Sequence, residues 1–141
     1  MVDNRQTKVT DDYDEYASNL NISTSYFYDK VGNLTEVQDN NDAWVNRYTY
    51  DKLDRRITIT YADSSTESFV YDNAGNLLTK TDQEGKVTVY LYDDVYRLTQ
   101  EIDDHGGLNL DTWRYYDAVG RMTGIEDDNN NSTTYDFDNA G

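Results

Sequence analysis

The sequence predicts an all-β fold in which tandem antiparallel β-hairpin repeats of about 21 residues form one curved or spiralling sheet strip. An aromatic residue followed by Asp recurs at near-constant spacing, with successive Asp residues 22, 21, 21, 24 and 21 positions apart. Clusters of Asp, Asn, Gly and Ser, the residues that turns favour, lie between these motifs. A fixed period of this length indicates a repeat architecture.

Each repeat has the features of a β-hairpin. Aromatic residues two positions apart, such as Tyr48 and Tyr50, lie on one face of a strand, and the variable residue between them lies on the other. The Asp that follows accepts hydrogen bonds from backbone amides, Gly adopts the positive φ that closes the turn, and Leu or Met begins the return strand. The residues of this repeat motif are Tyr28, Asp29, Gly32, Tyr50, Asp51, Tyr71, Asp72, Gly75, Tyr92, Asp93, Tyr116, Asp117, Gly120, Phe137, Asp138 and Gly141.

Two repeats depart from this motif, since Asp54 and Tyr96 occupy the position of the turn Gly. Asp tolerates the left-handed region better than most residues, whereas Tyr enters it at a cost. We therefore expect the turn at Tyr96 to differ in type from the turn at Gly75.

The repeats divide the chain into two parts. Residues 26–141 contain about five repeats, the last of which stops at the motif residue Gly141. Residues 1–25 are expected to form a partial N-terminal repeat with a longer acidic loop, because residues 5–12 align with residues 121–128. No segment predicts a helix.

Composition excludes several classes of function. The formal net charge of -16 opposes binding to nucleic-acid phosphates and to anionic membrane surfaces. The absence of Cys excludes disulfides and thiolate metal sites. No apolar run is long enough to insert into a membrane, and the first residues lack the apolar stretch of a signal peptide.

The segments YFYDKVGNL, YTYDKLDRR, FVYDNAGNL, YLYDDVYRL and YYDAVGRM resemble the YD-repeat or RHS-repeat family. The resemblance implies a strip of antiparallel β-hairpins that spirals into a hollow shell, as in bacterial toxins and in the teneurins of animal cell surfaces. Such shells enclose a toxic domain or present a binding surface. The resemblance therefore implies a secreted or cell-surface bacterial protein in which this chain is a non-enzymatic structural module.

The aromatic residues admit two interpretations. The motif aromatics are expected to stack from repeat to repeat as the core of the sheet. An alternative is a surface that binds glycans or a protein partner, because aromatic faces and acidic side chains suit sugar rings. The candidate glycan-binding residues lie outside the main ladder or at its variable positions, and they are Trp44, Tyr61, Tyr96 and Trp113.

The acidic turns are candidates for calcium binding, since carboxylate and amide oxygens are ligands that Ca²⁺ prefers. Asp127, Asn129 and Asn131 have oxygen-bearing side chains at alternate positions, but Ser132 stands where an EF-hand loop requires Gly. The alternative is that these residues are ordinary turn formers exposed to solvent. No other cofactor is expected, and with His105 as the single His no transition-metal or nucleophilic site can be assembled in the usual ways.

The two ends of the chain suggest which partners it has. Residues 138–141 form the first half of a hairpin, and the segment from Arg5 resembles the second half. Open sheet edges recruit further strands, so the expected partners are neighbouring repeats or further copies of the chain. Two interpretations follow: a fragment of a longer shell, or a subunit that assembles head to tail into a fibre.

Overall fold

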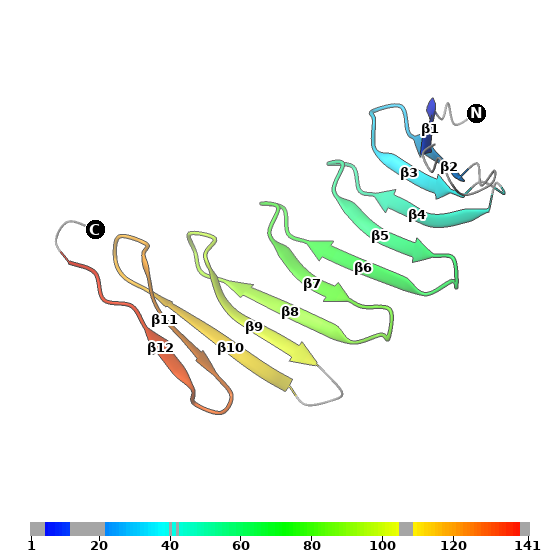
Figure 1. The fold of residues 1–141 in the computed structure, drawn as a ribbon. Helices are drawn as coiled ribbons and strands as arrows, with labels where there is room; N and C mark the ends of the chain where they lie inside the picture. The colour runs from blue at the N-terminus through cyan, green and yellow to red at the C-terminus, as the bar shows by residue number, and fades with distance from the viewer. Residues whose placement is uncertain (1–4, 12–21, 40, 42, 105–108, 139–141) are drawn as a thin grey trace. The chain divides into compact units, whose positions relative to one another are not determined.

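A computed structural model describes residues 5–11, 22–39, 41, 43–104 and 109–138 of the chain (Figure 1). These residues form twelve β-strands, and no helix occurs among them. The expectations that concern His105, Gly141 and the acidic N-terminal loop, at residues 12–21, lie outside the described residues. The strands are β1 Arg5–Asp11, β2 Ile22–Tyr28, β3 Leu34–Gln38, β4 Trp44–Tyr50, β5 Arg56–Tyr61, β6 Thr66–Tyr71, β7 Leu77–Thr81, β8 Val87–Tyr92, β9 Leu98–Asp104, β10 Asn109–Tyr116, β11 Met122–Asp127 and β12 Ser132–Thr134.

The chain divides into two compact units, Met1–Ser68 and Phe69–Gly141. The strands β1 to β6 follow one another in sequence order with antiparallel neighbours, and the boundary between the units falls within β6. In the second unit, β7 to β12 repeat this arrangement. The predicted all-β fold of tandem antiparallel hairpins is therefore confirmed. The described residues contain no helix of a length and apolarity that could cross a membrane.

Two sets of turns alternate along the chain, and in each unit Figure 1 shows one set at each end of the hairpins. The Tyr-Asp turns follow the aromatic motif and comprise residues 29–33, 51–55, 72–76, 93–97 and 117–121. The return turns comprise residues 39–43, 61–65, 82–86 and 127–131. In every turn the first residue donates its N–H to the carbonyl of the fifth, over distances of 2.8 to 3.1 Å. Both ends of a hairpin thus use one five-residue turn.

The turn at Tyr96 does not differ in type, so that expectation is wrong. Tyr96 N donates to Asp93 O at 2.9 Å and Asp93 N donates to Arg97 O at 3.0 Å, which is the same pattern as in the turn at Gly75. The φ angle of Tyr96 is 65°, against 102° for Gly75, so both residues are left-handed. The hydrogen bonds of the turn outweigh the steric cost that the Tyr side chain pays in this region.

A β-bulge follows the Tyr-Asp turns. The register shifts between Leu91 and Tyr92, so that Tyr92 pairs with Leu98 and Thr99 becomes the extra residue. The Thr99 hydroxyl donates to the Leu91 carbonyl at 3.1 Å, and the equivalent Thr35 donates to Phe27 at 3.1 Å. The extra residue is Thr35, Thr99 or Thr123 in three hairpins but Ile57 in the β4–β5 hairpin, so the hydrophobic pattern alone does not mark the bulge.

The two faces of the hairpins differ in burial. Along β4 half-buried and exposed residues alternate, with Tyr48 and Tyr50 on the half-buried face and Thr49 on the exposed face. Ile59, opposite Tyr48, is the buried apolar residue among those described, and no described side chain is fully buried. The motif tyrosines therefore form a half-buried row rather than an enclosed core, and Phe137 is exposed.

We predict that Tyr96→Gly stabilises the chain by about 1 kcal/mol. The substitution relieves a left-handed cost of about 1–2 kcal/mol, of which the greater freedom of Gly in the unfolded chain offsets about 0.5–1 kcal/mol. Little packing is lost because Tyr96 is 62% exposed. Urea unfolding measures the change, and Val95→Gly in the same turn is the control, which should destabilise. Equal destabilisation by both variants would contradict the prediction.

Candidate repeat-to-repeat interface

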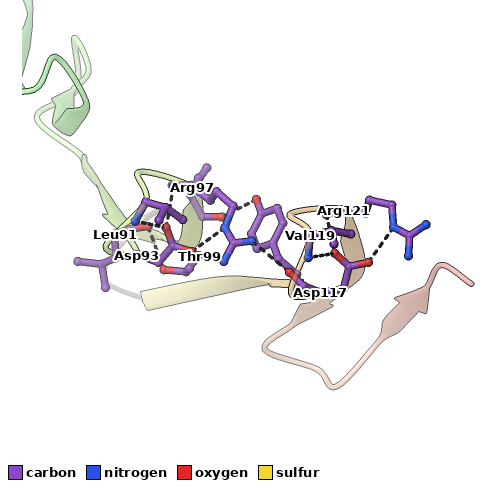
Figure 2. A network of polar contacts seen from close by, with 10 residues as sticks. Leu91, Asp93, Arg97, Thr99, Asp117, Val119 and Arg121 are labelled. Carbon is purple, nitrogen blue, oxygen red and sulfur yellow. Dashed lines mark hydrogen bonds and ion pairs between the residues drawn. The ribbon is translucent and has the colours of Figure 1, made fainter. Parts of the chain in front are cut away.

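The carboxylate of the motif Asp organises each Tyr-Asp turn. Asp93 Oδ1 accepts the backbone N–H of Val95 at 3.0 Å and of Arg97 at 2.9 Å, while Oδ2 accepts Arg97 Nε at 2.7 Å (Figure 2). The turns that begin at Asp29, Asp51, Asp72 and Asp117 contain equivalent bonds from the backbone and side chain of their fifth residue. One oxygen therefore fixes the turn, and the other orients the side chain of its fifth residue.

That fifth residue, Arg or Asn, extends to the next repeat. Arg97 Nη1 donates to the carbonyl of Asp117 at 3.3 Å, and its guanidinium lies 4.7 Å from the centroid of the Tyr116 ring. Arg121 lies over Phe137 in the same way, at 4.5 Å. In the first unit, Asn33 Nδ2 donates to Asp54 Oδ1 of the following turn at 2.9 Å. These contacts connect successive turns by cation–π and charge-assisted interactions.

The motif Tyr makes a second connection, in the opposite direction along the chain. The hydroxyl of Tyr116 donates to the carbonyl of Leu98, the residue that begins a strand of the preceding repeat, at 2.8 Å. Tyr50 and Tyr92 make the same bond to Leu34 and Leu77, at 2.7 and 3.0 Å. Burial raises the pKa of both Tyr50 and Tyr92, so their hydroxyls remain protonated donors at neutral pH.

The electrostatics of the turns favour the ionised carboxylates. The hydrogen bond from the Arg121 side chain lowers the pKa of Asp117, and with the bond from the Arg121 backbone amide it outweighs burial, which raises that pKa. At Asp93 the largest contribution to the lowered pKa is the backbone N–H of Arg97. The pKa is also lowered for Asp29, Asp51, Asp63, Asp72, Asp82 and Asp127.

The candidate glycan-binding residues lie in different surroundings. Trp44 and Tyr61 share one face of the β4–β5 hairpin, because Tyr61 pairs with Asn46 two residues from Trp44. Arg47 lies 4.5 Å from the centroid of the Trp44 ring, and the Tyr61 hydroxyl donates to Glu67. In the second unit, Tyr96 lies in a turn, whereas Trp113 lies within β10.

The candidate calcium ligands belong to a return turn. Asp127 Oδ1 accepts the backbone N–H groups of Asn129 and Asn131, and Oδ2 accepts Asn131 Nδ2, all at 2.9 Å. Both carboxylate oxygens thus stabilise the turn itself. Among the described residues, no group of three or more His, Cys, Asp or Glu side chains is arranged to hold a metal ion. Calcium binding at this turn stays a prediction.

Sequence reasoning missed the two residues that extend the motif. The fifth turn residue was visible as a repeated Arg or Asn, but its contact with the next repeat depends on the distance between hairpins. The bulge Thr was visible at Thr35, Thr99 and Thr123, one residue after the start of β3, β9 and β11. A period search that included polar positions would have found the recurring Thr, whereas the contact made by the Arg or Asn cannot be read from the period.

We predict that Tyr116→Phe destabilises the chain by about 1 kcal/mol, because it removes a hydrogen bond to a backbone carbonyl while keeping the ring. The reverse substitution, Phe137→Tyr, should stabilise by a similar amount, since Phe137 has the place of the motif Tyr under Arg121. Thermal and urea unfolding measure both changes. A destabilising Phe137→Tyr would show that the last repeat is built differently.

We also predict that acid destabilises the chain through the turn carboxylates. Their folded pKa lies below the unfolded value of about 4, so the stabilisation is complete above that value and is lost as the pH falls through the folded pKa. Urea unfolding between pH 7 and pH 2.5, at high salt to screen charge repulsion, should show this loss below about pH 4.

The variant Asp117→Asn should lose less stability between pH 7 and pH 2.5 than the unmodified chain does. Asp94→Asn is the matched control, because Asp94 is exposed at the second position of the adjacent Tyr-Asp turn. An identical acid slope in Asp117→Asn and the unmodified chain would contradict this assignment.

Comparisons with known proteins agree with this architecture. The family model described as "RHS Repeat" matches residues 28–66 and 71–108, which together are more than half of the chain. The search of curated proteins gives no match.

Several solved structures share the fold. A crystal structure of TcdB2-TccC3 without its hypervariable C-terminal region superposes with a TM-score of 0.62 at 19% identity, over 89% of this chain and 7% of that one. A TcdB2-TccC3-Cdc42 crystal structure gives 0.63 and the holotoxin pore of Photorhabdus luminescens 0.62, with the same identity and coverage. This chain thus spans a small part of the length of these proteins. Its fold and its motif together show that the chain belongs to the RHS-repeat family.

Proposed function

We propose that this chain is a non-enzymatic structural module that builds or extends the β-sheet scaffold of an RHS-repeat shell or surface protein. The observation that carries the proposal is that the residues repeated in register are those that connect one repeat to the next. Arg97 contacts the next turn, and Tyr116 bonds back to Leu98. Recurring side chains that bind the neighbouring repeats are what a scaffold built of repeats requires.

The use of the carboxylates supports a role without catalysis. Paired carboxylates are common in hydrolases, but here the motif Asp residues accept hydrogen bonds from their own turns. Asp117, for example, accepts the N–H groups of Val119 and Arg121 and the Arg121 guanidinium. Their lowered pKa values also disfavour the protonated form that a general acid needs.

Membership of the RHS-repeat family supports a proposal for the cellular location and the partners of the chain. We infer that the chain belongs to a secreted or cell-surface bacterial protein and that its partners are neighbouring repeats or further copies. The net charge of -16 disfavours nucleic acid and anionic membranes as partners. In size-exclusion chromatography and negative-stain microscopy, fibres would favour head-to-tail assembly, and a monomer would favour a part of a longer shell.

A second candidate function is a surface that binds glycans or a protein partner. The pair of Trp44 and Tyr61 on one face of a hairpin favours it, since two aromatic rings can stack on sugar rings. Binding on a glycan array that is lost in Trp44→Ala would support this function, and a blank array would remove it. Calorimetric titration with calcium tests the turn at Asp127 in the same way.

The scaffold proposal predicts that one whole repeat can be removed. Deletion of residues 72–92 joins Tyr71 to Asp93 and restores the motif. Because repeats contact only their neighbours, the shortened chain should fold and lose about 1–3 kcal/mol of stability, at about 0.05–0.15 kcal/mol per residue. Circular dichroism and urea unfolding measure this result.

Deletion of residues 72–86 is the control, because it removes both turns between β6 and β8 and joins the two strands directly. We expect this chain to lose the β spectrum. Loss of folding in both deletions would refute a modular scaffold and would indicate a single cooperative domain with a fixed number of strands.

A further inference from the structure

The two sets of turns differ at one position although their backbone geometry is shared. The third residue of the Tyr-Asp turns is always aliphatic, and the third residue of the return turns is always polar or acidic. The Tyr-Asp turns have Val31, Leu53, Ala74, Val95 and Val119. The return turns have Asn41, Asp63, Glu84 and Asn129.

The turn does not require an aliphatic third residue, whereas two of the polar third residues are bonded within their own turns: Asp63 accepts the N–H of Ser65, and Glu84 pairs with Lys86. The backbone N–H of Val95 donates to Asp93 at 3.0 Å, and the backbone N–H of Glu84 donates to Asp82 at 2.9 Å. The same turn therefore forms with an apolar or with a charged residue at its third position. The selection of aliphatic residues at one set of turns must have another cause.

These aliphatic side chains are exposed. Val31, Leu53, Val95 and Val119 are between 64% and 77% accessible to solvent. A single exposed aliphatic residue is ordinary, but its recurrence at the same turn position in both units is not. We call the turns at residues 29–33 and 51–55 the first-unit edge, and those at 93–97 and 117–121 the second-unit edge.

The spacing and charge of these edges indicate what covers them. Successive Tyr-Asp turns are two strands apart, which is about 10 Å. A partner that contacts every turn must have the same spacing. Another copy of this chain has it. The residue before the aliphatic one is Lys30 and Lys52 in the first-unit edge, and Asp94 and Ala118 in the second, so a Lys of one edge can pair with Asp94 of the other.

We propose that the first-unit edge of one copy binds the second-unit edge of a second copy, with Leu53 against the partner's Val95 and Lys52 beside the partner's Asp94. A contact between two return turns is disfavoured, because Asp63 of one copy would meet an acidic residue of the other. The inference deepens the proposed scaffold function, on which it rests, by adding a lateral contact between strips to their continuation along the chain.

The contact is small, so two copies with few repeats associate weakly. Each edge consists of two short turns, against the roughly 20–30 residues on each side of a stable interface, and longer arrays gain strength because their turns bind together. Association must therefore be measured at high concentration. Analytical ultracentrifugation of the full chain up to about 1 mM is suited to this range.

The test replaces the aliphatic residues with the types that the return turns use, in a variant with Val31→Asn, Leu53→Asp, Val95→Glu and Val119→Asn. We expect the unmodified chain to form dimers and the variant to remain monomeric with an unchanged circular dichroism spectrum. The matched control changes the return turns instead, with Asp63→Asn and Glu84→Gln, and should dimerise as the unmodified chain does or more strongly.

A charge exchange tests the pairing itself. Lys52→Asp should weaken association about tenfold or more by placing like charges together, and the double variant with Asp94→Lys should restore it. An unmodified chain that stays monomeric at all concentrations, or an edge variant that dimerises unchanged, would overturn the proposal. Neither result would affect the repeat-deletion experiment, so failure of this contact and failure of the scaffold function are distinguishable.

Discussion

The structure depends on the hydrogen bonds of the motif Asp carboxylate. One of its oxygens stabilises the turn, and the other orients the side chain that contacts the next repeat. In the turn at Asp93, one oxygen accepts the amides that reverse the chain, and the other holds Arg97. The held guanidinium then contacts Tyr116 and the next turn. Local turn formation and repeat-to-repeat contact are therefore coupled through a single side chain, so neither can vary without the other.

This coupling compensates for a thin hydrophobic core. A single sheet layer leaves both faces near solvent, and Ile59 is the buried apolar residue among those described. Large proteins with packed layers obtain most of their stability from apolar burial. Here half-buried tyrosines contribute ring area and a hydroxyl bond at once, as Tyr50 does with Leu34. The abundance of Tyr over Leu and Ile follows from this double use.

The sequence predicted the hairpins and their faces well because both depend on local chemistry. The alternation of aromatic and polar residues around Thr49 and the regular spacing of the motif Asp residues are enough to place strands and turns. The turn at Tyr96 was predicted wrongly, because the prediction used only the cost of the left-handed conformation for Tyr. The carboxylate of Asp93 stabilises the whole turn and outweighs that cost. The role of Arg97 could not be predicted, because its target lies 20 residues away in sequence.

The difference between the two sets of turns was visible in the sequence and was overlooked for a physical reason. Alignment on the aromatic motif weights positions that are buried or hydrogen-bonded, and the third turn residue is neither a core nor a motif position. Val95 and Glu84 occupy equivalent places, each donating its amide to a turn Asp. In the Tyr-Asp turns the third side chain is exposed and its aliphatic character recurs, which indicates contacts outside the repeat, whereas Glu84 pairs with Lys86 inside its own turn. Comparing equivalent positions within one chain therefore separates the requirements of folding from those of assembly.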